Sequence, residues 1–135
     1  MVMPAAKLIL ILVAVALLLA AGLSLQRLRS QRRPVDVTLG AGIFPRDCAS
    51  CHGASGEGQG SAPPLNQTGH AHHHPDWELY SFIAEGRTGL AAMPAWKGRL
   101  SKGEIRAVIA YIKTLWTEQQ RRFQEEINRA RPSPP

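Results

Sequence analysis

The chain has 135 residues, which is enough for one small domain with flanking segments. Its formal charge of +6 is unevenly spread, because residues 1–35 hold five basic side chains and no acidic one, whereas residues 36–117 hold seven of each. A nucleic-acid-binding domain would carry its basic side chains on the folded part of the chain, so this balance excludes nucleic acid as the expected partner.

An apolar segment near the N-terminus is typical of a membrane or export sequence. Residues 8–25 contain no charged side chain over eighteen positions. A helix of that length is about 27 Å long, close to the roughly 30 Å hydrocarbon core of a bilayer. We therefore expect residues 1–26 to form a single N-terminal transmembrane helix in contact with membrane lipid. A cleaved signal peptide is the alternative, because Lys7 precedes the segment and small residues occur near its end.

A basic linker is expected at residues 27–39, directly after the apolar segment. The positive-inside rule, taken alone, would keep the residues that follow this linker in the cytoplasm. The cysteine motif further along the chain favours the opposite side of the membrane. The arginines that create the conflict are Arg27, Arg29, Arg32 and Arg33.

The only two cysteines lie in one motif, Cys48-Ala49-Ser50-Cys51-His52. A redox dithiol would use the two thiols alone and would normally follow a strand, which the sequence does not indicate. A zinc site would need two more ligands from the later histidines. Covalent attachment of a haem uses all three residues, because the thiols bond the porphyrin vinyl groups while the adjacent imidazole ligates the iron. The contiguous His52 therefore favours a c-type haem, with zinc and a dithiol as alternatives.

Helix signals dominate the rest of the chain. Residues 75–85 fit a short helix that begins at Pro75 and stops at Gly86. Ser101 and Glu104 form a capping box, behind which apolar residues at helical spacing predict one buried face. No segment alternates with period two for long enough to predict a strand, so the expected fold class is all-α. The residues of the buried face are Ile105, Val108, Ile109, Ile112, Leu115 and Trp116.

A single methionine follows the apolar segment, within Gly89-Leu90-Ala91-Ala92-Met93-Pro94-Ala95-Trp96. The glycine lets the backbone approach a flat cofactor, and Pro94 stiffens the loop that carries the sulfur. We expect Met93 to be the second axial ligand of the iron, with a core methionine as the alternative.

These features resemble the class I c-type cytochromes, in particular the small bacterial, membrane-attached monohaem kind, from about Gly40 to Trp116. Gly40 and Phe44 resemble the glycine and aromatic that precede the family's haem motif, and Tyr111 resembles an aromatic of its closing helix. Pro63-Pro64-Leu65 resembles its proline-x-leucine segment, in which the proline carbonyl accepts the N–H of the proximal histidine. The resemblance implies a cytochrome c-like fold of about four short helices around one covalently bound haem c at residues 40–117. Cys48 and Cys51 would hold this haem, and His52 and Met93 would be its axial ligands.

The haem pocket and the first helix carry further expectations. We expect Pro63, Leu65, Leu90 and Trp96 to line the pocket, with ordinary core packing as the alternative for the last three. Pro45 departs from the family pattern, because proline removes a hydrogen bond inside a helix and clashes with the preceding turn. We therefore expect the first helix to break at Phe44.

Four of the five histidines lie within residues 70–74. In an extended loop, His72 and His74 would project to one side and His70 could join them. Three converging imidazoles could then bind one metal ion, and copper would be the expected ion. The favoured interpretation is nevertheless a polar loop in which one histidine reaches a haem propionate and the others are solvated, with the copper site as the alternative.

Residues 118–135 are expected to form a charged helical extension with a proline-rich tail. The pairs Glu118–Arg122 and Glu125–Arg129 have the favourable i,i+4 order. A narrow seam of Trp116, Phe123 and Ile127 suggests either a solvated helix or a face that docks a partner.

Two protein ligands on the iron would leave no position for a substrate, so the expected function is electron transfer rather than enzymatic catalysis. The expected partners are a membrane electron donor and a terminal oxidase or a soluble carrier. The expected location is the bacterial cytoplasmic membrane, crossed once, with the haem domain on the periplasmic side. A gas-ligand sensor with a dissociable Met93, and a copper-handling module at residues 70–74, are the alternatives.

Overall fold

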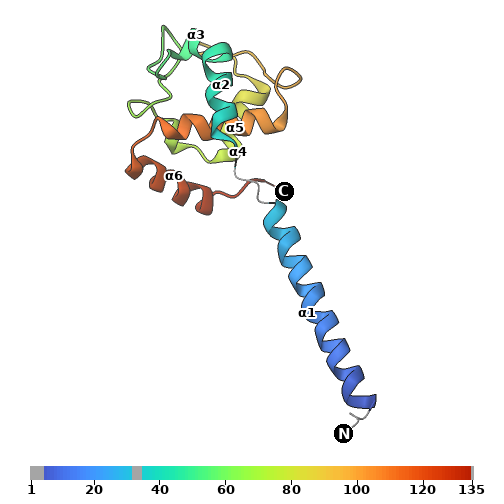
Figure 1. Cartoon of the computed structure of the whole chain (residues 1–135). Coiled ribbons are helices and arrows are strands. Elements are labelled where there is room, and N and C mark those ends of the chain that lie inside the picture. The colour runs from blue at the N-terminus through green and yellow to red at the C-terminus, as the bar shows by residue number, and fades with distance from the viewer. Residues whose placement is uncertain (1–4, 32–34, 135) are drawn as a thin grey trace. The chain divides into compact units, whose positions relative to one another are not determined.

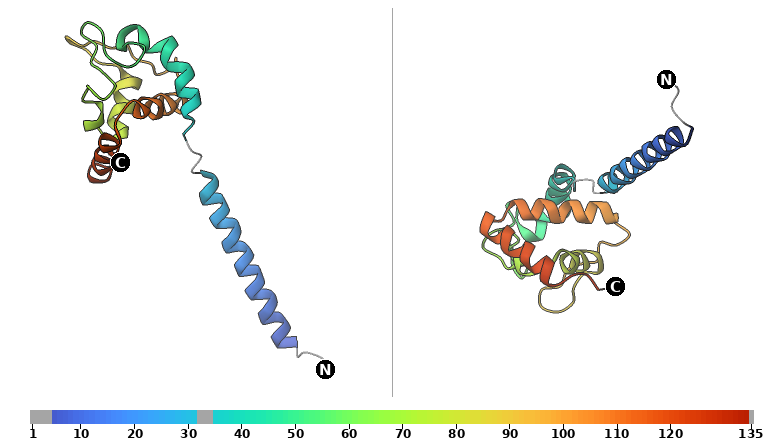
Figure 2. Two further views of the ribbon diagram at one scale, coloured as in Figure 1. Left: turned by 60° about the vertical axis from the view of Figure 1, so that its left-hand side comes forward. Right: turned by 90° about the horizontal axis from the view of Figure 1, so that it is seen from below.

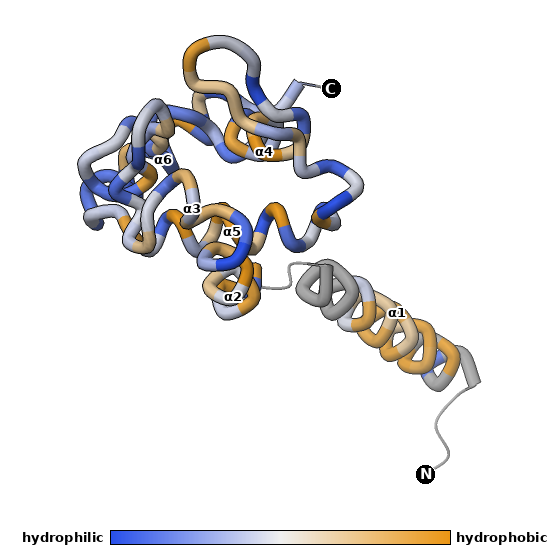
Figure 3. Tube along the Cα trace, turned by 90° about the horizontal axis from the view of Figure 1, so that it is seen from above, coloured by the Kyte–Doolittle hydropathy of each residue, from blue (hydrophilic) through white to orange (hydrophobic). Residues whose placement is uncertain are grey.

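The computed structural model describes residues 5–31 and 35–134. The chain divides into two compact units, Met1–Pro34 and Val35–Pro135 (Figure 1). The first unit contains helix α1 (Ala5–Gln31), which is apolar along much of its described length (Figure 3). Within the described ranges, however, no helix has the combined length and apolar character needed to cross a membrane, so the structure does not support the expected transmembrane helix. Arg32 and Arg33 of the expected linker lie outside the described residues.

The second unit is helical and confirms the all-α prediction. Backbone pairing across residues 35–134 is limited to two isolated bridges, and no strand forms there. Figures 1 and 2 show α2 and α6 on different sides of α5. The helices are α2 (Val37–Asp47), α3 (Ala49–His52), the 3-10 helix η1 (Ala71–His73), α4 (Asp76–Glu85), α5 (Lys102–Thr114) and α6 (Glu118–Ala130).

The closest packing in the unit is between α2 and α5. Gly40 lies against the backbone of α5, and a Cβ atom placed on it would lie 2.0 Å from the carbonyl oxygen of Ala107. One turn further along, the fully buried ring of Phe44 packs on Tyr111 with 5.2 Å between ring centroids. The absence of a side chain at Gly40 therefore lets the two helices cross closely enough for the aromatic pair to form.

The expected break of the first helix at Phe44 is wrong. Helix α2 continues through Pro45 to Asp47, and the chain turns at Cys48, whose N–H still bonds the Phe44 carbonyl at 2.9 Å. Pro45 lies in the last turn of the helix, where it removes a single backbone bond. The buried side chains of Ile43 and Phe44 hold the segment in place against that loss.

Side-chain caps define where the later helices begin. The capping box before α5 is confirmed, since the Glu104 N–H donates to Ser101 Oγ at 3.3 Å and the Ser101 N–H donates to the Glu104 carboxylate at 2.8 Å. A second capping box, between Thr117 and Gln120, begins α6. This box fixes the first turn of α6, on which later contacts depend.

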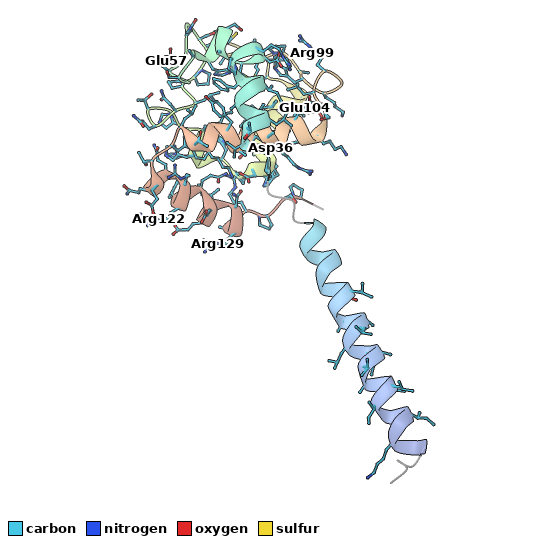
Figure 4. All side chains as sticks on the ribbon, viewed as in Figure 1. Asp36, Glu57, Arg99, Glu104, Arg122 and Arg129 are labelled. Carbon is cyan, nitrogen blue, oxygen red and sulfur yellow. The ribbon has the colours of Figure 1, made fainter. Side chains whose placement is uncertain are left out.

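Helix α6 packs back onto its own unit mainly through polar side chains. Gln124 is only 1% exposed, and its amide N–H groups donate to the His74 carbonyl and to the Asp76 carboxylate. Phe123 of the expected apolar seam remains 44% exposed, beside the rings of η1. Arg122 and Arg129 form the expected pairs with Glu118 and Glu125 on the side of α6 that faces away from α5 (Figure 4).

Candidate cofactor site

His52 is the best-positioned side chain of the motif. It ends the short helix α3, is 8% exposed, and its Nδ1 atom lies 2.9 Å from the carbonyl oxygen of Pro63. A carbonyl can only accept a hydrogen bond, so this contact places the ring proton on Nδ1. The lone pair of Nε2 is therefore free to bind a metal ion, with the ring orientation fixed by the loop that carries Pro63.

The two cysteines lie one helical turn apart: Cys48 is the residue between α2 and α3, and Cys51 lies within α3. Both thiols are free; Cys51 is exposed, while Cys48 is half-buried against the core. Burial is the main cause that raises the pKa of the Cys48 thiol to about 11. Reactive dithiols have lowered thiol pKa values, so the environment of Cys48 argues against the redox-dithiol alternative.

A cavity of about 630 Å³ opens beside this motif, within the size range of ligand pockets. Cys51, His52, Pro63 and Leu65 line one part of it, and Met93 lines another. Helices α4 and α5 contribute an apolar part of the wall, through Leu79, Phe82, Ile83, Ile109 and Ile112.

A backbone bridge presents Met93 to the cavity. Arg87 and Met93 exchange two backbone hydrogen bonds, each 2.9 Å long, which closes the loop between them. The Trp96 N–H then donates to the Ile83 carbonyl at 3.1 Å and attaches the loop to α4. The half-buried Met93 is therefore held by backbone hydrogen bonds of its own residue and by a further one three residues later in the chain.

Two of the expected pocket residues lie elsewhere. Leu90 is 100% exposed and does not line the cavity, because it sits at the tip of the loop that the Arg87–Met93 bridge closes. Trp96 packs against the core, with the Arg99 guanidinium over its ring, and is also absent from the cavity wall. Pro63 and Leu65 both line the cavity.

Among the described residues, the histidine cluster does not form the copper site considered as the alternative. Residues 71–73 form a 3-10 helix instead of an extended loop, so alternate side chains do not share one side. His72 turns inward toward Trp116, while His74 turns toward Glu78, with 3.1 Å between Nδ1 and the carboxylate. In the part of the chain that the structure describes, no three His, Cys, Asp or Glu side chains are placed to hold a metal ion.

Sequence reasoning missed the α4 wall of the cavity. Leu79, Phe82 and Ile83 have the i, i+3, i+4 spacing of one helix face, which is a signal that the sequence contains. Trp77 and Tyr80 of the same helix instead line a separate cavity. Arg87 also lines the candidate cofactor cavity, and no pattern in the sequence distinguishes it from other arginines.

The residues around the cavity fit a covalently attached haem. They combine the Cys51 thiol, an imidazole with a free Nε2, a thioether and a largely apolar wall, and the second thiol, Cys48, lies one turn before Cys51, half-buried against the core. These are the groups that such a cofactor requires. A zinc site would need four converging ligands, and the described residues offer no such group.

Comparison with known proteins agrees with this fit. Residues 35–112 match the family described as cytochrome c oxidase, cbb3-type, subunit III. The chain is 35% identical over 86 residues to the cbb3-type cytochrome c oxidase subunit FixP of Bradyrhizobium diazoefficiens, covering 62% of this chain but only 29% of FixP. It is 37% identical over 78 residues to cytochrome c6 of Leptolyngbya boryana, covering 57% of this chain and 89% of that protein.

A solved structure shares the fold. Cytochrome CL from Methylophaga aminisulfidivorans superposes with a TM-score of 0.56 at 22% identity, covering 73% of this chain and 66% of the other. At that identity, the likeness supports the fold alone.

Proposed function

Because the chain belongs to the cytochrome c family, in the group described as subunit III of cbb3-type cytochrome c oxidase, we propose that residues 40–117 form a monohaem domain that transfers single electrons. The family's cofactor is a covalently bound haem c, which supplies one-electron oxidation and reduction when bound. The observation that carries the proposal is the hydrogen bond from His52 to Pro63 at the cavity that Cys51 and Met93 also line.

Each residue of the site has a separate role in this proposal. Cys48 and Cys51 would hold the porphyrin through thioether bonds, and His52 would ligate the iron through Nε2. Met93 would supply the second axial ligand through its sulfur. With both axial positions taken by the protein, no position is open to a substrate, which favours electron transfer over catalysis by this domain.

The partners follow from the relatives as a proposal. FixP is named as a subunit of a cytochrome c oxidase, and this chain spans less than a third of its length. We propose that this haem domain likewise passes electrons to a terminal oxidase or a soluble carrier, and that it receives them from a membrane-bound donor.

The location is proposed from the sequence. Residues 8–25 are uncharged, as expected of an anchor or an export signal, although no described helix qualifies as a membrane span. Exported cytochromes acquire their haem outside the cytoplasm, so we place the haem domain on the periplasmic side of a bacterial cytoplasmic membrane. Protease added to spheroplasts should digest this domain, and full protection would contradict the placement.

The reaction of the reduced protein with carbon monoxide tests the proposed function. An electron carrier with two protein ligands should titrate as a single one-electron couple, and carbon monoxide should leave its ferrous spectrum unchanged. A spectrum that shifts with carbon monoxide would mean that Met93 leaves the iron readily, and would favour the gas-sensor alternative.

A further inference from the structure

The loop that carries Pro63 is held from two sides. On one side, the carbonyl of Gly56 accepts hydrogen bonds from the Leu65 N–H at 2.7 Å and the Asn66 N–H at 3.0 Å. These contacts join the loop to the segment that follows His52, so they are local to the cysteine motif.

On the other side, the loop is held by the C-terminal part of the chain. The indole N–H of Trp116 donates to the Leu65 carbonyl at 2.8 Å, and the side-chain amide of Gln120 donates to the Gln67 carbonyl at 2.9 Å. Each of these two bonds joins residues that are more than fifty positions apart in the sequence.

Both donors are themselves fixed. Trp116 is 3% exposed, and its ring contacts His72 with 6.0 Å between centroids. Gln120 accepts the Thr117 N–H at 3.0 Å through its side-chain oxygen, as part of the capping box that begins α6. Because the side-chain oxygen is held by the capping box, the amide nitrogen of Gln120 points toward the loop and donates to it.

We propose that Trp116 and Gln120 are positioning residues for His52: they hold the Pro63 carbonyl within hydrogen-bond distance of its Nδ1 atom. Both lie beyond residues 35–112, the range that matches the family model. The proposal rests on the proposed function, because it requires His52 to ligate the iron.

The physical consequence concerns the basicity of the imidazole. A hydrogen bond from Nδ1–H to a carbonyl raises the electron-donating strength of the ring, which stabilises the ferric state. If the loop loosens, this bond lengthens and the reduction potential rises. Trp116 holds the loop two residues from Pro63 and Gln120 holds it four residues away, so the loss of the Trp116 bond should have the larger effect.

Two variants remove the bonds with little other change. Trp116→Phe keeps an aromatic ring in the core but has no N–H, and Trp77→Phe is its control, because it removes a similar bond to the Arg131 carbonyl on another part of the unit. Gln120→Glu keeps the oxygen that caps α6 but has no N–H to donate. Gln119→Glu is its control, since it adds the same charge at the neighbouring exposed position.

The readouts are the reduction potential and the exchange rate of the His52 Nδ1 proton, observed by NMR in the haem-loaded protein. We expect the potential to rise and the proton to exchange faster in Trp116→Phe and Gln120→Glu, relative to their controls. Equal potentials and exchange rates in each variant and its control would overturn the proposal and leave the proposed function standing. If Trp116→Phe does not fold, Gln120→Glu decides alone. A wild-type chain that binds no haem would overturn the proposed function first.

Discussion

The backbones of Arg87 and Met93 exchange two hydrogen bonds, with an N···O distance of 2.9 Å in each. Gly86, just before this bridge, has a φ of +72°, and a Cβ atom placed on it would lie 2.6 Å from the Met93 carbonyl oxygen. The glycine therefore allows the bridge to form against the end of α4. As a result, Met93 is presented by rigid backbone rather than by a free loop.

The first prediction concerns Met93 as an axial ligand. Met93→Ala should abolish the sulfur-to-iron charge-transfer band at the red end of the ferric spectrum, and should lower the reduction potential, because a soft thioether stabilises ferrous iron. Leu90→Ala is the control, since Leu90 is on the same loop but fully exposed. If the wild type lacks the band and Met93→Ala leaves the potential unchanged, His70 or His74, which line the same cavity, is the ligand instead.

The second prediction concerns the crossing of α2 and α5. Gly40→Ala should lower the free energy of unfolding by about 1–3 kcal/mol, because its Cβ atom would force the two helices apart. Gly42→Ala on the same helix has open space around it, and should instead be neutral or stabilising by up to about 1 kcal/mol. Chemical denaturation of the two variants measures both values. Equal stability of the two would show that the close crossing does not matter.

The third prediction concerns the pH dependence of the contact between α4 and α6. Burial alone would raise the pKa of Asp76, but hydrogen bonds from Lys113, Gln124 and Asn128 outweigh burial, so the pKa lies below its ordinary value of 3.8. A carboxyl with a lowered folded-state pKa stabilises the fold above its unfolded-state pKa, and this stabilisation is lost as the pH falls through the folded-state pKa.

Asp76→Asn should therefore be less stable than the wild type at pH 7, and the difference should shrink as the pH falls below about 3.8. Thermal melts at several pH values measure this convergence. Glu118→Gln serves as the control, because Glu118 makes only an exposed ion pair and should change stability little at any pH. A difference between Asp76→Asn and wild type that stays constant with pH would contradict the assigned role of the charge.

The features that the sequence predicts correctly are those that a few neighbouring residues determine. The motif from Cys48 to His52 needs only one turn of helix, and the capping box needs only Ser101 and Glu104. The contact between His52 and the Pro63 carbonyl is predicted only through the family resemblance, because the two residues are distant in sequence.

The features that sequence reasoning missed depend on long-range packing. Leu90 is apolar, yet it is exposed because it lies in the middle of a loop whose two ends are joined by the Arg87–Met93 bridge. Gln124 is polar, yet it is buried because the His74 carbonyl and Asp76 satisfy its amide. The histidines at 70–74 form a helical turn rather than an extended loop, a choice between two local structures that the residue pattern does not settle.

Attachment of haem to the two cysteines tests the account most directly. The protein, exported in a strain that attaches haem to c-type cytochromes, would be separated by denaturing electrophoresis and stained for haem peroxidase activity. We predict a stained band for the wild type and no band for the Cys48→Ala, Cys51→Ala double variant, because the chain has no other thiol to hold the cofactor. An unstained wild type, or a double variant that stains as strongly as the wild type, would contradict the account.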